Sequence, residues 1–162
     1  MNPHSLRIGI GHDTHRLQPG GPLRIGGVDI PFAYELVGHS DADVLLHAIT
    51  DALLGASALG DIGELFPNTA AENHNRDSIE MLSLAAAEVS KAGFQLINID
   101  CIIFAQKPKM LDHRAAITST IAEALKLEKS RVSVKAKTGE SVGPVGKGLS
   151  IEAQCIALLY QA

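Results

Sequence analysis

The chain has 162 residues, of which 46% are hydrophobic and 20% charged, and its formal net charge is −4. A chain of this length can fold as one domain without help from a metal, and it contains no apolar run of the roughly 18 residues that a membrane span requires. The acidic balance and an aromatic content of 4%, without tryptophan, argue against a nucleic-acid partner. We expect a soluble protein with neither a nucleic-acid nor a membrane partner.

The first part of the chain predicts a strand, a hairpin and a helix, in that order. Alternating apolar residues indicate a strand that begins at residues 6–10. Residues 23–32 are typical of a short hairpin interrupted by two glycines. Apolar residues at helical spacing then predict a helix that ends near Gly60, with Ser40 and Asp43 as its capping box.

The rest of the chain alternates helices and strands. The expected segments are an exposed polar loop at 61–77, a helix at 79–93, a strand at 94–106, a helix at 117–127, a strand at 131–137, a glycine-rich loop at 139–148 and a last strand at 149–160. This order predicts a single α/β domain over residues 1–162, an α+β sandwich with a mostly four-stranded mixed sheet, a small hairpin and about three helices on one face. Residues 156–159 are apolar on both faces of their strand, which favours an oligomer.

The N-terminus and the two cysteines bear on the cellular compartment. The first residues carry neither the basic nor the apolar region of a signal peptide, so we expect cytoplasmic residence. Cys101 and Cys155 lie in apolar strands without a Cys-x-x-Cys partner. This setting predicts buried, reduced thiols, to which we assign no chemical role.

Asp13, His15 and His47 form the pattern that says most about function. On a strand, alternation points Asp13 and His15 to one face, and a helix that brings His47 alongside completes a site of two histidines and one carboxylate. Three protein ligands leave one coordination position open for a substrate oxygen, which favours catalysis over a structural site. Asp43 and Asp51 lie one turn to either side of His47 and are predicted to orient its ring. A lone helical histidine is more often an ordinary residue, so the inference depends on the whole set.

Two further segments are suited to phosphate. His39 and Ser40 precede the predicted helix, where free N–H groups favour a phosphate oxygen. Residues 135–148 contain Thr138, Glu140 and several glycines, so this loop can present N–H groups, a hydroxyl and a carboxylate to phosphates and a second cation. Taken alone, the first segment is also explained as a helix cap and the second as a flexible turn.

A succession of short motifs resembles one known family. The motifs are residues 7–15, 25–28, 39–47, 50–56, 60–63, 66–67, 105–110 and 134–136. From about Leu6 to the C-terminus, and in the same order, they are similar to the 2-C-methyl-D-erythritol 2,4-cyclodiphosphate synthase family. The resemblance implies an enzyme of non-mevalonate isoprenoid biosynthesis, a phosphorus–oxygen lyase that converts 4-diphosphocytidyl-2-C-methyl-D-erythritol 2-phosphate into the 2,4-cyclodiphosphate and CMP. It also implies a homotrimer around packed sheets, with active sites between neighbouring subunits.

The same resemblance assigns roles to matching positions. The metal ligands would be Asp13, His15 and His47 for Zn²⁺ and Glu140 for Mg²⁺ or Mn²⁺. The positions that stabilise the transition state would be His39 and Thr138. The substrate-binding positions would be Ser40, Asp61, Ile62, Gly63, Phe66, Asn68, Ala105, Gln106, Lys107, Pro108, Lys109, Met110, Leu111, Lys137, Gly139, Pro144 and Lys147. Of these, residues 105–111 would receive the cytidine end. Pro144, Lys147 and Leu149 depart from the Phe, Arg and Glu of many members, so a central isoprenoid-phosphate pocket is not implied.

Two other functions are compatible with parts of this pattern. Two histidines and a carboxylate are also typical of non-haem iron oxygenases, and Arg131 with Ser133 mimics the oxo-acid contact of those enzymes. Three helical segments and a glycine-rich loop argue against an all-β oxygenase barrel. A trimeric nucleotide-binding or metal-storage protein would keep both sites but lack turnover. The open ligand position and the second carboxylate favour an enzyme.

Overall fold

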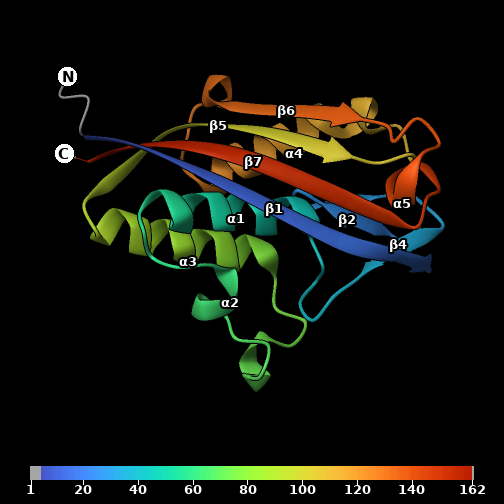
Figure 1. The fold of residues 1–162 in the computed structure, drawn as a ribbon, viewed down its shortest axis with the longest axis horizontal. Helices are drawn as coiled ribbons and strands as arrows, with labels where there is room; N and C mark the ends of the chain where they lie inside the picture. The colour runs from blue at the N-terminus through green and yellow to red at the C-terminus, as the bar shows by residue number, and fades with distance from the viewer. Residues whose placement is uncertain (1–4, 162) are drawn as a thin grey trace.

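The computed structural model describes residues 5–161, and a five-stranded mixed sheet forms its centre (Figure 1). The strands, in their order across the sheet, are β4 (Tyr34–Val37), β1 (Leu6–Pro19), β7 (Ser150–Gln161), β5 (Phe94–Phe104) and β6 (Val132–Lys137). Neighbouring strands are antiparallel except for β5 and β6, which are parallel. The predicted hairpin is present as β2 (Leu23–Ile25) and β3 (Val28–Ile30). The predicted sheet lacked only β4, a short edge strand that pairs with the end of β1.

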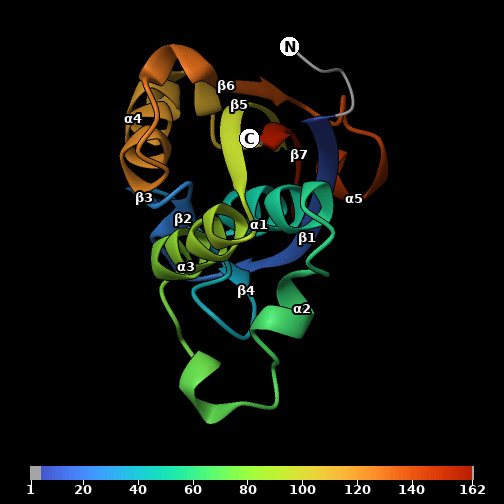
Figure 2. The ribbon, with the colours of Figure 1, turned by 90° about the vertical axis from the view of Figure 1, so that its left-hand side faces the viewer.

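Three long helices lie on one face of the sheet (Figure 2). They are α1 (Val44–Ala56), α3 (Ser78–Lys91) and α4 (Arg114–Ala124). Helix α1 packs directly on β1 and β7, α3 packs on α1, and α4 lies against β6. The loops contain the short helices α2 (Ile62–Leu65) and α5 (Gly143–Gly146) and the 3-10 turns η2 (Ala71–Asn73), η3 (Met110–His113) and η4 (Lys129–Arg131). Within residues 5–161, no helix has the length and apolar character needed to cross a membrane.

Two glycines on the inner face of β1 bring the strand into direct contact with α1. A Cβ atom on Gly11 would lie 1.9 Å from the carbonyl oxygen of Ala48, and one on Gly9 would lie 2.0 Å from that of Ala52. The strand and the helix run in opposite directions. Two residues of a strand advance by about 6.7 Å and four residues of a helix by about 6 Å, so each step of two along β1 matches a step of four along α1. The next inward position of the strand is Asp13, which therefore comes beside the first turn of the helix.

The start of α1 is held by Asp43, and the predicted capping box with Ser40 is wrong. Asp43 is the N-cap residue and is fully buried, and its carboxylate accepts hydrogen bonds from three backbone N–H groups. The donors are Leu46 at 3.1 Å, Gly26 at 2.9 Å and Gly27 at 2.7 Å. Burial raises the pKa of Asp43, and the three N–H groups oppose that shift. One carboxylate thus joins the turn of the β2–β3 hairpin to the helix that carries His47.

Replacing Asp43 with alanine is expected to lower the free energy of unfolding by roughly 3 kcal/mol, because the change leaves buried N–H groups without an acceptor. Urea denaturation would measure the loss. Asp77 provides a control, since it caps α3 from an exposed position through one bond to the N–H of Ile79 and its other contact is a part-exposed ion pair with Arg24. The Asp77→Ala variant is expected to lose only about 1 kcal/mol. Equal losses in the two variants would contradict the assigned role of Asp43.

The outer face of β1 and β7 is apolar and open. Ile8, Ile10 and Ile156 are 73%, 67% and 50% exposed. These isoleucines give the sheet an apolar surface suited to another protein chain.

Cys101 and Cys155 are buried and unbridged, and they lie opposite each other on β5 and β7, as the sequence predicts. Hydrogen bonding with Cys101 and burial both raise the pKa of Cys155, so this thiol stays protonated.

Candidate metal and substrate site

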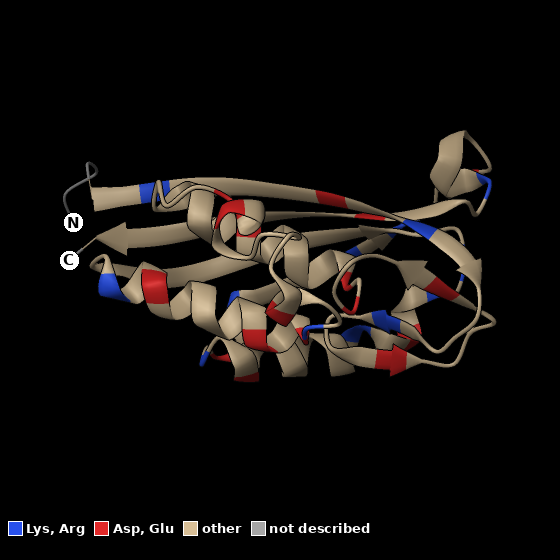
Figure 3. Cartoon of the chain, turned by 90° about the horizontal axis from the view of Figure 1, so that it is seen from below, with Lys and Arg blue, Asp and Glu red and all other residues tan. Residues whose placement is uncertain are grey.

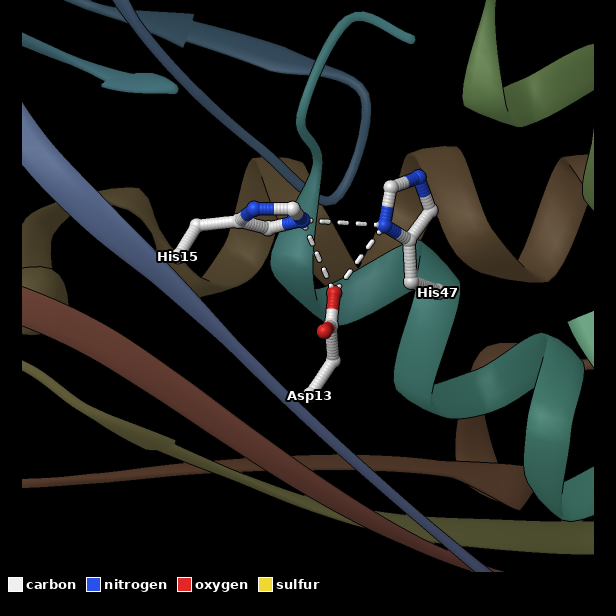
Figure 4. Close-up of side chains that lie close together, drawn as sticks. All are labelled: Asp13, His15 and His47. Carbon is white, nitrogen blue, oxygen red and sulfur yellow. Dashed lines mark hydrogen bonds and ion pairs between the residues drawn. The ribbon is translucent and has the colours of Figure 1, made fainter. Parts of the chain in front are cut away.

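Asp13 and His15 from β1 meet His47 from α1 at a single point (Figure 4). Asp13 Oδ2 lies 3.0 Å from His15 Nε2 and 3.0 Å from His47 Nδ1. The two ring nitrogens are 3.1 Å apart. The side chains are mostly buried, and the two histidine rings meet edge to face. Three potential ligand atoms from two distant segments of the chain therefore form a nearly equilateral triangle.

Hydrogen bonds on the far side of each ring direct a lone pair into this triangle. His15 Nδ1 lies 2.9 Å from the carbonyl oxygen of Val37, which can only accept, so this nitrogen carries a proton and Nε2 of the neutral ring does not. His47 Nε2 lies 2.9 Å from the hydroxyl of Ser78 and 3.0 Å from that of Ser40. When Nε2 donates to these hydroxyl oxygens, Nδ1 is left free to coordinate.

The negative charge of Asp13 favours a positive charge at the centre of the cluster. Burial alone would raise the pKa of Asp13, but the hydrogen bonds and charges of the two histidines outweigh burial and hold that pKa well below its usual value. Burial alone would lower the pKa of His15, but Asp13, together with the Val37 carbonyl and the charge of Asp43, outweighs burial and raises that pKa. Each partner therefore stabilises the charged form of the other. A bound divalent cation would stabilise the negative charge of Asp13 in the same way.

The donor set and its spacing fit a divalent metal ion. Imidazole nitrogen and carboxylate oxygen are ordinary zinc ligands, and tetrahedral bonds of about 2.0–2.1 Å place neighbouring ligand atoms roughly 3.3 Å apart. The three atoms here are separated by 3.0 to 3.1 Å. Only small side-chain movements would adapt the cluster to such an ion. Asp13, His15 and His47 would be its protein ligands.

The prediction that Asp43 and Asp51 orient the ring of His47 is wrong. Asp43 hydrogen-bonds to the hairpin and its own helix, as described above, and Asp51 accepts from the N–H of Ile62 at 2.8 Å. The groups at His47 Nε2 are instead the hydroxyls of Ser40 and Ser78. Ser78 was missed because the predicted helix began at Ile79. The Asp77-Ser78 pair, a typical helix start, was the signal that could have found it.

The segment around His39 is joined to the loop after α2. The N–H of Asn75 donates to the carbonyl of His39 at 3.0 Å, and the N–H of Asp41 donates to the carbonyl of Arg76 at 3.2 Å. The rings of His39 and His74 pack edge to face with centroids 5.3 Å apart. His74 is exposed and did not stand out in the sequence. This loop is tied to the segment that leads into α1.

Helix α2 contains or adjoins most of the other predicted positions near α1. Asp61 is its N-cap, Ile62 and Gly63 lie within it, and Phe66 follows it. Phe66 is buried, and the guanidinium of Arg76 lies 5.2 Å from the centre of its ring. Asn68 lies in the turn beyond Phe66. The predicted exposed loop at 61–77 is therefore partly structured, because the Asp51 carboxylate fixes the first turn of α2.

The remaining predicted residues gather at the ends of the parallel strands β5 and β6. The N–H of Ala105 donates to the carbonyl of Lys137 at 2.9 Å, which joins the 105–111 segment to the end of β6. The hydroxyl of Thr138 donates to Glu140 at 2.7 Å. Beyond them, the glycine-rich loop contains α5, in which Pro144 lies, and Lys147 follows that helix.

Within one chain, this second group does not meet the metal cluster. Register pairs place Lys137, Phe104, Glu152 and Thr14 in one row across the sheet. Three strand spacings of about 4.8 Å separate β6 from β1, or roughly 14 Å in all. Thr138 and Glu140 therefore lie well away from Asp13, His15 and His47 of the same chain.

Comparison with known proteins decides the family. Residues 6–160 match the model of the YgbB family. This chain belongs to the YgbB family. Membership, together with relatives named 2-C-methyl-D-erythritol 2,4-cyclodiphosphate synthase, confirms the resemblance found in the motifs. The mixed sheet with its helices is not the all-β barrel that the iron-oxygenase hypothesis required.

Relatives of this YgbB-family chain are similar over nearly its whole length. The 2-C-methyl-D-erythritol 2,4-cyclodiphosphate synthase of Paraburkholderia phymatum is 55% identical over 156 residues, which cover 96% of this chain and 98% of the relative. The structure of the bifunctional IspDF from Campylobacter jejuni matches with a TM-score of 0.93 at 41% identity, covering 97% of this chain and 42% of that one. A CDP complex of IspF from Plasmodium falciparum matches with a TM-score of 0.85 at 34% identity, covering 97% of both chains.

Proposed function

We propose that this chain is a metal-dependent cyclase that converts 4-diphosphocytidyl-2-C-methyl-D-erythritol 2-phosphate into the 2,4-cyclodiphosphate and CMP. It would act as a phosphorus–oxygen lyase in isoprenoid precursor biosynthesis, with residues 1–162 as one catalytic domain. The observation that carries the proposal is the convergence of Asp13, His15 and His47 in a chain of the YgbB family. Their three lone pairs leave one side open for a phosphate oxygen.

The reaction needs no nucleophile from the protein. An oxygen of the substrate's 2-phosphate forms a bond to the β-phosphorus, and the bond between that phosphorus and the CMP oxygen breaks, with the electron pair leaving on CMP. Zn²⁺ held by Asp13, His15 and His47 would supply Lewis acidity to the β-phosphate. His39, in the segment that leads into α1, and Thr138, at the end of β6, would stabilise negative charge on the phosphates in the transition state.

Local groups have to supply the attraction for this anionic substrate. Lys and Arg are interspersed with Asp and Glu along the fold rather than gathered on one element (Figure 3). Glu140 would hold Mg²⁺ or Mn²⁺ against the diphosphate, and its hydrogen bond with Thr138 keeps the two side chains together. The CDP complex of the Plasmodium falciparum relative supports a cytidine ligand. By the resemblance, residues 105–111 would receive the cytidine. The segment around α2, with Ser40, would contact the erythritol phosphate.

We further propose a homotrimer whose sites form between neighbouring subunits. Support comes from the roughly 14 Å that separate the two predicted halves of the site within one chain. The exposed isoleucines of β1 and β7 offer a surface on which a second copy could pack. In such an assembly the metal cluster of one subunit would face the 105–111 and 137–140 segments of the next. Cytoplasmic residence stays a prediction from the sequence.

The decisive experiment incubates purified protein with the cytidylylated substrate and detects CMP and the cyclic product by mass spectrometry. We expect both products in equal amounts, their loss after treatment with a chelator, and recovery when Zn²⁺ is returned together with Mg²⁺ or Mn²⁺. Metal analysis of the same sample should find zinc. Iron together with oxygen-dependent turnover would contradict the proposal, and metal binding without product would favour the storage or nucleotide-binding alternative.

A further inference from the structure

We propose that Ser78 is a positioning residue that, with Asp41 and Arg24 behind it, fixes the ring of His47 so that Nδ1 faces the metal. The inference rests on the metal site of the proposed function and extends it to side chains that contact no ligand of that site except His47. It starts from the hydroxyl of Ser78, which lies 2.9 Å from His47 Nε2 and is fully buried at the start of α3. The direction of this hydrogen bond decides which ring nitrogen carries the proton.

The hydroxyl proton of Ser78 is directed away from His47. Ser78 Oγ is hydrogen-bonded to Asp41 Oδ1, and a carboxylate oxygen can only accept. A hydroxyl has one proton, so the contact between Ser78 and His47 Nε2 must use the Ser78 oxygen as acceptor. His47 then carries its proton on Nε2, and the lone pair of the neutral ring is on Nδ1.

Asp41 is held as an acceptor by donors on both of its oxygens. Oδ1 accepts from the N–H of Asp43 at 3.2 Å in addition to the Ser78 hydroxyl. Oδ2 accepts from Arg24 Nε at 3.0 Å and from the N–H of Ser78 at 3.0 Å. Arg24 is itself anchored by Asp29 at 3.1 Å and Asp77 at 3.2 Å. These four donors hold the carboxylate in the orientation in which it accepts from Ser78.

Ser40 reaches the same ring nitrogen but is not fixed in the same way. Its hydroxyl oxygen lies 3.0 Å from His47 Nε2 and accepts from the N–H of Ala42 at 3.3 Å. Ser40 is only partly buried, whereas Ser78 is fully buried. The Ser40 hydroxyl proton therefore stays available to a ligand, which fits its predicted substrate contact. Ser78 is the group that sets the orientation of the ring.

The expected consequence is a selective loss of metal affinity. A second group that orients a histidine ligand typically contributes 10- to 100-fold to metal affinity or activity. In the Ser78→Ala variant, the N–H of residue 78 still binds Asp41, so the helix start is preserved. The change removes the buried acceptor for His47 together with its hydrogen bond to Asp41, and it leaves the partly buried Ser40 hydroxyl as the remaining acceptor at Nε2. We expect the affinity for Zn²⁺ to fall at least about 10-fold, and kcat to fall while KM changes little.

The test measures Zn²⁺ binding to the whole protein by competition with a chromogenic chelator, alongside thermal unfolding with and without Zn²⁺. Ser83→Ala is the matched control, because Ser83 lies on the same helix and, within residues 5–161, its hydroxyl hydrogen-bonds only to the carbonyl of Ile79. Ser78→Ala should lose zinc affinity and most of the zinc-dependent rise in Tm, while its zinc-free Tm stays close to that of Ser83→Ala. A purely structural role would instead lower the zinc-free Tm and leave the affinity unchanged.

A double-mutant cycle tests whether Asp41 acts through Ser78. Asp41→Asn should also weaken Zn²⁺ binding, and combining it with Ser78→Ala should cost no more than Ser78→Ala alone, because the two changes break one chain of hydrogen bonds. Additive losses would overturn the proposed chain. Unchanged affinity in both single variants, with normal Zn²⁺ binding by the unmodified protein, would overturn this inference alone. Failure of the unmodified protein to bind Zn²⁺ would overturn the metal site itself.

Discussion

Replacing His47 with alanine is expected to abolish turnover while the fold remains. The change removes one of three metal ligands, and the ion supplies several kcal/mol of charge stabilisation in the transition state, so the rate should fall by about 10³-fold or more. His47 is mostly buried at the first turn of α1, but its partners are polar groups of the site rather than the apolar core. Steady-state kinetics with the cytidylylated substrate would measure the rate, and circular dichroism would check the fold.

The control for this variant is another histidine of the same chain. His113 lies in η3, outside the metal cluster, and His113→Ala should keep Zn²⁺ binding and most of the activity. In His47→Ala, the zinc content after dialysis should fall in parallel with turnover. Full activity in His47→Ala would contradict the assigned role, and so would a loss of turnover that arises only because the variant unfolds.

Replacing Gly11 with alanine is expected to destabilise the fold strongly. The added methyl carbon would lie 1.9 Å from the carbonyl oxygen of Ala48 and 2.8 Å from the backbone nitrogen of Ala52, so the helix backbone itself would have to move. A shift of that kind should lower the free energy of unfolding by about 3 kcal/mol or more. Chemical denaturation would measure it. The fraction of Gly11→Ala that still folds should bind Zn²⁺ weakly, because the displaced α1 would carry His47 away from Asp13 and His15.

Gly55, near the C-terminal end of the same helix, provides a matched control. It is exposed, and apart from its chain neighbours and the backbone of its own helix no atom lies within 4 Å of the position that its Cβ would take. Gly55→Ala should therefore raise the free energy of unfolding by up to about 1 kcal/mol, as expected for alanine in place of glycine in a helix, and should leave Zn²⁺ binding unchanged. Equal stability of the two variants, or normal Zn²⁺ affinity in Gly11→Ala, would contradict the proposed contact between strand and helix.

The metal cluster could be predicted because its residues obey local periodicity. Alternation along β1 placed Asp13 and His15 on one face, and helical spacing placed His47 on an adjacent helix. The groups around them were harder, because Ser78 reaches His47 across 31 residues of sequence and depends on the packing of α3 against α1. Asp43 was assigned to His47 because it lies one turn before that residue. The same position is the N-cap of α1, and the sequence alone does not separate the two roles. The bonds of Asp43 to Gly26 and Gly27 depend on where the hairpin folds back.

The substrate positions show a different limit of sequence reasoning. The segments 105–111 and 137–140 were each assigned by the resemblance, and the backbone bond between Ala105 and Lys137 shows that they lie together. Their distance from Asp13 follows from the strand order, which periodicity does not determine. The edge strand β4 escaped for a related reason, since it has only four residues and pairs with an extension of β1 that no alternation of apolar residues marks.

The glycine contact between β1 and α1 bears on how this protein tolerates substitution. Main-chain atoms of the strand touch main-chain atoms of the helix at Gly9 and Gly11, with no side chain between them. The distance from Asp13 and His15 to His47 is therefore set by atoms that are the same whatever amino acids fill the surrounding core. Leucine, isoleucine and valine positions deeper in that core can exchange with one another over generations while the spacing of the three ligands is preserved.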